Sequence, residues 1–251
     1  MVFYFVLNPI LHVGSYHGGS LLDFYLHTIG AGPLWFVLAL LAFDACYAAF
    51  RRANSRASER KPLTYRTVIG FVVAQALATF ALRTVIPIGF WVPVVDFPTS
   101  AYLPQYVSFF VLGTVAYRRG WFDTIAARMG WAGLGLAIGA TLLFLPLALT
   151  GEWSGHGTLS SLFYALWDSS FAVGVVLALL TLFSRKFNSP GRLGRLSGRT
   201  FTMYVIHAFV VTAAGYALSA LNLPTLAKFA IAAVVVLPAC FLLAGRMRRV
   251  L

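Results

Sequence analysis

Seven long apolar runs, separated by short polar segments, dominate the pattern of this chain. Each run is long enough to cross about 30 Å of hydrocarbon as a helix, at about 1.5 Å per residue. None shows the alternation of apolar and polar positions that a membrane β-barrel requires. The pattern therefore predicts an all-α bundle of about seven transmembrane helices. The predicted spans are 33–50, 67–90, 101–117, 130–150, 161–184, 200–221 and 225–245.

Basic residues gather in alternate connections between these runs. They follow the first, third, fifth and seventh predicted spans, whereas segments 91–100, 151–160 and 222–224 contain no lysine or arginine. Because cytosolic loops are enriched in lysine and arginine, the basic connections, including loop 185–199, are predicted to be cytosolic. The carboxyl end is then inside, and residues 1–29 are predicted to be extracytoplasmic.

Composition excludes a soluble globular protein. Of the 251 residues, 60% are hydrophobic and 10% are charged, whereas soluble domains carry about 25% charged residues. A net charge of +12 would suggest a nucleic-acid partner in a soluble protein. Here the basic residues lie in alternate loops, and membrane topology together with contact with anionic lipids explains this placement. No nucleic-acid partner is therefore predicted. Residues 1–251 show no linker or repeat and are predicted to form one membrane domain.

Four of the ionisable groups inside the predicted spans are the first candidates for chemistry, because a charge in hydrocarbon is costly without a partner or a water-filled cavity. Arg83 and Asp168 fall at similar depth in the outer half, which predicts a structural ion pair. Asp44 and His207 both fall in the cytosolic half and could meet there. Histidine exchanges protons near neutral pH, so His207 suits a general base, although a structural hydrogen bond explains both residues equally well.

Other common site patterns are missing from the sequence. The remaining histidines and the two cysteines match no metal-ligand spacing, so no metal site is predicted. Nucleotide-binding and serine-hydrolase motifs are also absent. Aromatic residues near the span ends, among them Trp121 and Trp153, are interpreted as anchors at the membrane surface. Intramembrane charges and proline-interrupted helices leave a proton-coupled transporter or flippase open as an alternative.

Three stretches resemble acyltransferase family 3, a membrane family that includes O-antigen acetylases and periplasmic-glucan succinyltransferases. They are 32–41 (GPLWFVLALL), 102–121 (YLPQYVSFFVLGTVAYRRGW) and 201–207 (FTMYVIH). The resemblance implies a bundle of about ten helices with both ends in the cytosol. The family's Arg-then-His motif in its first helix has no counterpart here, and residues 1–11 would cover only about half a bilayer. We therefore expect the chain to be the C-terminal part of such a bundle.

The resemblance also implies an activity and a set of site residues. The activity is transfer of an acyl group of acetyl or succinyl type from cytosolic acyl-CoA to a hydroxyl of an extracytoplasmic glycan or lipid-linked sugar. No bound cofactor is implied, and the expected location is the bacterial inner membrane. A non-catalytic remnant of the fold is a further alternative. The predicted site residues are catalytic His207 and Asp44, substrate-binding Trp35, Gln105, Tyr106 and Tyr204, and donor-binding Arg118, Arg119 and Arg199.

Overall fold

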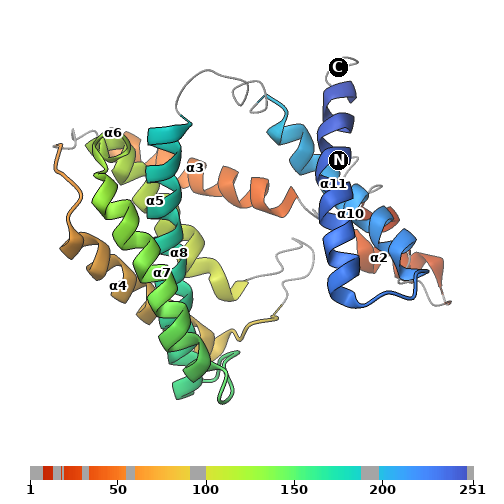
Figure 1. Ribbon diagram of the computed structural model, residues 1–251, viewed down its shortest axis with the longest axis horizontal. Helices are drawn as coiled ribbons and strands as arrows, with labels where there is room; N and C mark the ends of the chain where they lie inside the picture. Colours follow the sequence, from red (N-terminus) through yellow and green to blue (C-terminus); the bar gives the residue numbers. More distant parts are fainter. Residues whose placement is uncertain are drawn as a thin grey trace. The chain divides into compact units, whose positions relative to one another are not determined.

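The computed structural model confirms the all-α prediction for the part of the chain that it describes (Figure 1). The described residues are 8–13, 18, 20–29, 34–54, 60–90, 100–187 and 198–247. The chain divides into two compact units, each of which is described by itself. The first unit comprises 1–39, 93–96 and 189–251, and the second comprises 40–92 and 97–188.

In the part of the chain that the structure describes, seven long helices form close to the seven apolar runs. They are α3 (Trp35–Ala53), α4 (Tyr65–Val85), α5 (Leu103–Arg119), α7 (Ala127–Ala148), α8 (Leu159–Lys186), α10 (Thr200–Ser219) and α11 (Thr225–Met247). Within the described residues, five of them are long and apolar enough to cross a membrane, and α3 and α5 are not among these five. Helix α5 has 17 residues, or about 25 Å, and α3 carries Asp44, Arg51 and Arg52. The predicted count of seven spans is therefore not confirmed.

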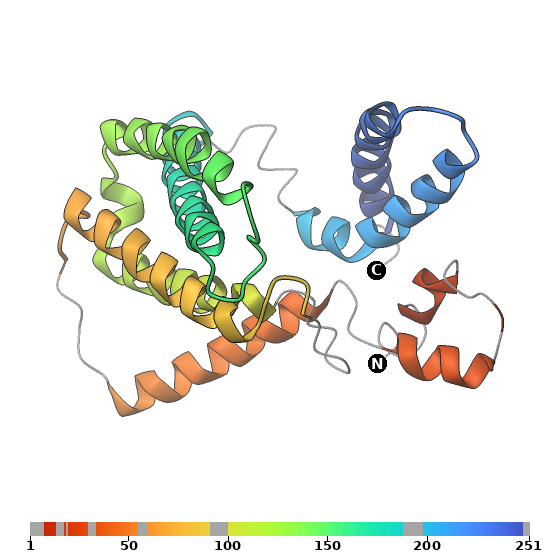
Figure 2. The same cartoon turned by 90° about the horizontal axis from the view of Figure 1, so that it is seen from below.

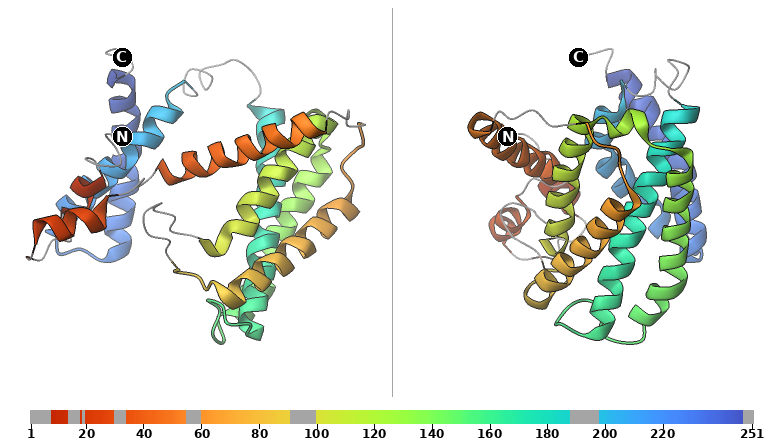
Figure 3. Two further views of the ribbon diagram at one scale, coloured as in Figure 1. Left: turned by 180° about the vertical axis from the view of Figure 1, so that it is seen from behind. Right: turned by 90° about the vertical axis from the view of Figure 1, so that its left-hand side faces the viewer.

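Helices α7 and α8 pack side by side in the second unit (Figure 3). A Cβ atom on Gly133 would lie 2.7 Å from the carbonyl oxygen of Gly174, so the two backbones touch. Small residues commonly allow such close approach between membrane helices. Helix α4 packs on α8, and α5 packs on α4. The apolar core of this unit contains Val72, Met129, Val173 and Leu177.

Local sequence signals set the ends of α4. The Thr64 hydroxyl accepts a hydrogen bond from Thr67 N–H at 3.2 Å and caps the first turn, as N-cap threonines commonly do. The helix ends at Val85 rather than at residue 90 as predicted. Pro87 explains the difference, because proline disfavours helical geometry in the preceding residue and cannot donate a backbone hydrogen bond.

A glycine connects α5 to the short helix α6 (Trp121–Thr124). Gly120 adopts a left-handed φ of 69°, a conformation that costs glycine little. The turn directs Trp121 inward, where its side chain is 3% exposed and its Nε1–H donates to the Lys61 carbonyl at 2.7 Å. The prediction that Trp121 anchors the protein at the membrane surface is therefore wrong.

The described residues of the first unit form two short helices, the start of α3 and a helical hairpin. The short helices are α1 (Asn8–Leu11) and α2 (Leu21–Thr28), and α10 and α11 pair as the hairpin, shown in blue in Figure 2. The predicted sides of segment 1–29 and loop 185–199 stay predictions. Arg185 and Lys186 belong to the last turn of α8, and 188–197 lie outside the described residues.

Candidate functional site

A buried ion pair joins α4 to α8 in the second unit. Arg83 Nη2 donates a hydrogen bond to Asp168 Oδ2 at 2.8 Å. The Arg83 side chain is fully buried, and that of Asp168 is 16% exposed. Burying two charges is tolerable only when they neutralise each other in good geometry. The predicted Arg83–Asp168 pair is therefore confirmed.

Two tyrosine rings enclose the Arg83 guanidinium. Its central carbon lies 4.6 Å from the ring centre of Tyr102 and 5.4 Å from that of Tyr164. Arg83 Nε and Nη1 have no hydrogen-bond partner within the described part of the chain, and the ring faces attract the cation instead. Arg83 thereby links α4 to α8 and to the 3₁₀ helix η4 (Ser100–Tyr102). These contacts support a structural role for the pair.

The connection between α7 and α8 folds over the same end of α4. His156 N–H donates to the Arg83 carbonyl at 3.1 Å, and Ile88 N–H donates to the Ser154 carbonyl at 2.8 Å. The Glu152 carboxylate accepts hydrogen bonds from the hydroxyl and backbone N–H of Ser154, and these bonds lower the pKa of Glu152. Segment 151–160, which is predicted to be extracytoplasmic, is therefore hydrogen-bonded to the end of α4 that carries the ion pair.

A buried polar stripe extends from Arg83 along α4. Gln75 Nε2 donates to Thr79 Oγ1 at 3.2 Å, and the Ser108 hydroxyl of α5 donates to Gln75 Oε1. Gln75, Thr79 and Arg83 are all buried. The sequence interpretation missed Gln75 and Thr79 as buried polar residues. Their spacing of four was the available signal, because it places all three side chains on one helix face.

A groove between α3 and α5, here called the α3–α5 groove, brings together two of the predicted donor-binding residues. It has a volume of about 580 Å³, and Arg118 and Arg119 lie at the end formed by the last turn of α5. Its walls are largely apolar and aromatic. The lining residues are Phe43, Cys46, Tyr47, Phe50, Val107, Phe110, Val111, Thr114, Val115, Arg118 and Arg119. An apolar groove with a cationic end suits a ligand that carries phosphate groups.

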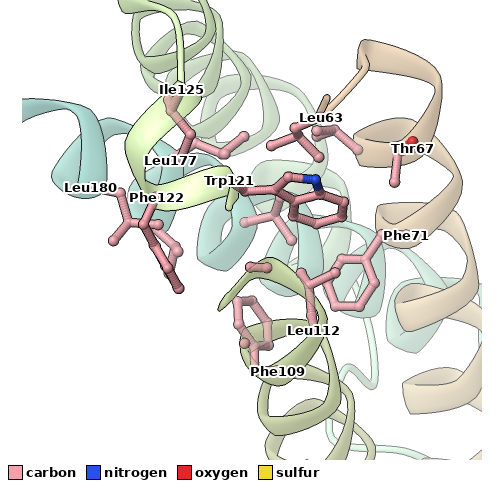
Figure 4. Close-up of a pocket in the computed structure, with 15 residues that line it drawn as sticks. Leu63, Thr67, Phe71, Phe109, Leu112, Trp121, Phe122, Ile125, Leu177 and Leu180 are labelled. Carbon is pink, nitrogen blue, oxygen red and sulfur yellow. The ribbon is translucent and has the colours of Figure 1, made fainter. Parts of the chain in front are cut away.

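A second pocket, here called the Trp121 pocket, lies against the opposite face of α5. It has a volume of about 220 Å³ and is bounded by α4, α5, α6 and α8. Its lining exposes apolar atoms only. Figure 4 shows the indole of Trp121 among Leu63, Phe71 and Leu112. The sequence interpretation missed this pocket, because it depends on how the Gly120 turn aims the indole.

Tyr204 and His207 interact within one turn of α10. Their ring centres are 5.6 Å apart, and His207 Nδ1 is hydrogen-bonded to the Tyr204 backbone carbonyl. Because a carbonyl oxygen can only accept, this hydrogen bond requires a proton on Nδ1, and in the neutral Nδ1–H tautomer the lone pair is on Nε2. His207 is exposed. This tautomer is the one that a base acting through Nε2 requires.

The two predicted catalytic residues belong to different units. Asp44 is exposed on α3 in the second unit, whereas His207 belongs to the first. Their meeting therefore stays a prediction. Trp35 begins α3 in the first unit, and its ring packs edge-on against Phe36 at 5.9 Å between centres.

The remaining predicted residues lie on α5 and beside α10. Gln105 and Tyr106 occupy the first turn of α5, at the opposite end from Arg118 and Arg119. The predicted binding roles of Gln105 and Tyr106 stay predictions. Arg199 packs on α11, because its guanidinium carbon lies 4.6 Å from the ring centre of Phe241. Its proposed contact with the donor stays a prediction.

Comparison with known proteins identifies the family. A family model described as an acyltransferase domain matches residues 1–245. No match was found among curated proteins or among solved structures. The matched range contains all three stretches that carry the resemblance, together with four of the five helices that are apolar enough to cross a membrane and all but the last residues of the fifth, α11. The chain therefore belongs to acyltransferase family 3, whose members are membrane enzymes that transfer acyl groups other than amino-acyl groups.

Proposed function

We propose that this chain transfers a small acyl group, of acetyl or succinyl type, from cytosolic acyl-CoA to an extracytoplasmic hydroxyl. The acceptor is a glycan or a lipid-linked sugar, and the proposed location is the bacterial inner membrane. The observation that carries the proposal is the family match over residues 1–245. It favours acyl transfer over the transporter that the intramembrane charges had left open.

The α3–α5 groove supports a donor site at the predicted cytosolic end of α5. Arg118 and Arg119 line it, and the Arg118 guanidinium would bind a donor phosphate there through charge-assisted, often bidentate hydrogen bonds, whereas the Arg119 guanidinium packs against Trp121. Arg51 lies beside Arg118 in an adjoining pocket between the same two helices. The aromatic walls of the groove offer an apolar surface to the less polar part of the donor.

His207 supports the proton transfer that the reaction needs. Its Nε2 takes the proton of the acceptor hydroxyl while the hydroxyl oxygen attacks the thioester carbonyl carbon. The carbon–sulfur bond then breaks, and the proton passes to the leaving thiolate, which gives an ester and free CoA. The Tyr204 carbonyl holds the ring in the tautomer that can accept this proton.

The proposal is tested by measuring acyl esters on the surface glycan of cells that produce the chain. Replacement of His207 by Gln should lower ester content about 10²–10⁴-fold, which is the usual effect of losing a general base. The matched control is His27→Gln, because His27 is also exposed but lies on the short helix α2. Near-normal ester content in the His207→Gln variant, at equal protein level, would assign His207 to packing and contradict the proposed mechanism.

A further inference from the structure

The Trp121 pocket has an apolar interior that no other part of the described unit fills. Its volume is about 220 Å³, and its lining exposes apolar atoms only. The hydrogen bond from Trp121 Nε1 to the Lys61 carbonyl fixes the indole, which lies among the other lining side chains (Figure 4). Apolar cavities of about 150 Å³ already accept hydrocarbon ligands such as benzene. The pocket is therefore large enough for part of a hydrocarbon chain.

Two basic side chains lie close to Trp121 and the Gly120 turn, although neither is among the residues that line the pocket. The guanidinium carbon of Arg119 lies 5.8 Å from the ring centre of Trp121. Arg119 Nε is buried and has no hydrogen-bond partner within the described residues. A Cβ atom on Gly120 would lie 3.9 Å from Arg60 Nε, so a second guanidinium approaches the same turn. Charge complementarity therefore indicates a ligand with an anionic group directly beside an apolar chain.

We propose that the Trp121 pocket binds one acyl tail of an anionic phospholipid, with the lipid phosphate held by Arg119 and Arg60. In a diacyl phospholipid, only the glycerol carbons and ester oxygens separate the phosphate from the tail. In acyl-CoA, the whole pantetheine arm lies between the phosphates and the acyl group. The Arg119 guanidinium carbon lies 5.8 Å from the centre of the indole that lines the apolar interior, and this short separation favours the phospholipid over the donor.

The predicted topology places the Trp121 pocket next to the membrane leaflet that contains anionic phospholipids. The turn at Gly120 follows the third predicted span, on the side that the basic loops assign to the cytosol. The cytosolic leaflet carries anionic lipids, and basic pockets between membrane helices on that side bind their headgroups. The lipid tail would occupy the space between α5 and α8, which both contribute lining residues to the pocket.

The test uses the purified full chain in phosphatidylcholine vesicles that contain a photoreactive phosphatidylglycerol with its reactive group on one acyl tail. We expect the label to attach to peptides of α5, α6 and α8 that line the pocket. Leu112→Trp, which fills the pocket, should abolish this labelling. Leu142→Trp is the matched control, because Leu142 is 73% exposed on α7, and it should leave the labelling unchanged.

A second variant keeps the test informative if Leu112→Trp fails to fold. Arg119→Gln leaves the apolar lining intact and should weaken labelling by the phosphatidylglycerol probe about tenfold, the loss expected for a charge-assisted hydrogen bond. It should not change labelling by the matching phosphatidylcholine probe. Equal labelling by both probes in the unmodified chain, or labelling that survives both variants, would overturn the proposal. Displacement of the probe by hexanoyl-CoA would also overturn it, by making the pocket a donor site.

Discussion

Arg83 is the largest fully buried side chain in the described part of the molecule. Its charge is compensated by Asp168 at 2.8 Å and by two tyrosine rings. His207, in contrast, is exposed, and its Nδ1 is hydrogen-bonded to the backbone carbonyl of Tyr204 in the same helix. At the scale of single residues, the enclosed charge of Arg83 serves the fold. The exposed imidazole of His207, with a lone pair on Nε2, is suited to proton transfer.

Replacing one partner of the Arg83–Asp168 ion pair should destabilise the protein more than replacing both partners. Arg83→Leu alone leaves Asp168 buried without its partner, which should lower the free energy of unfolding by about 3–5 kcal/mol. The double variant Arg83→Leu, Asp168→Leu removes both charges and should recover part of this loss. Thermal unfolding in detergent measures both effects. Equal stability of the single and double variants would show that Asp168 is solvated without Arg83.

Cys46 offers a native probe of the α3–α5 groove. It is exposed and lines the groove, whereas Cys240 is buried. In a Cys240→Ala background, CoA should slow alkylation of Cys46, because a bound donor covers the groove. Arg118→Gln should remove this protection by weakening phosphate binding. Mass spectrometry of the alkylated protein measures the rate, and an alkylation rate that CoA leaves unchanged would place the donor elsewhere.

At the scale of helices, the tightest association in the second unit rests on glycine. Gly133→Ala should destabilise the α7–α8 pair by about 1–3 kcal/mol, a common cost of overpacking, because the added Cβ would lie 2.7 Å from the Gly174 carbonyl oxygen. Gly139→Ala in the same helix is the control, since nothing lies within 4 Å of its added Cβ. Thermal unfolding should separate the two variants. Identical melting temperatures would mean that α7 and α8 separate freely.

Hydrophobic periodicity was sufficient to locate the helices but not their ends or their packing. The seven apolar runs match α3, α4, α5, α7, α8, α10 and α11, because backbone groups in lipid must be satisfied within each segment. The end of α4 was misplaced, since the effect of Pro87 was underweighted. Helix α6 and the burial of Trp121 were missed, because four residues carry no periodic signal and the direction of the indole depends on one left-handed glycine.

At the scale of the whole molecule, the basic loops predict which ends of the helices face the cytosol. In a chain with both native cysteines replaced, Ser58→Cys should react with an impermeant maleimide only after cells are permeabilised. Thr150→Cys lies just beyond the C-terminal end of α7, next to segment 151–160, which is predicted to be extracytoplasmic. It should therefore react in intact cells. Ser58 itself lies outside the described residues. Labelling of Ser58→Cys from outside intact cells would show that the orientation is the reverse of the predicted one. The α3–α5 groove would then be on the wrong side of the membrane for a cytosolic donor.

The sequence placed the Arg83–Asp168 pair correctly because both residues had the same predicted depth and opposite charge. It could not place Asp44 relative to His207, since a contact between distant helices depends on packing that depth alone does not determine. The family assignment stands on a different kind of observation, a match over residues 1–245. The family match therefore establishes the enzyme class for the chain as a whole. The proposed roles of individual site residues are argued from local geometry.

Acyl transfer across the membrane is the central claim, and vesicles of defined orientation test it most directly. The full chain is reconstituted with a glycan or lipid-linked sugar acceptor on one face, and acyl-CoA labelled in its acyl group is supplied on either face. The account predicts labelled ester on the acceptor only when acyl-CoA is supplied to the face carrying the basic loops. Ester formation only from acyl-CoA on the opposite face, or no ester from either face with correctly inserted protein, would contradict it.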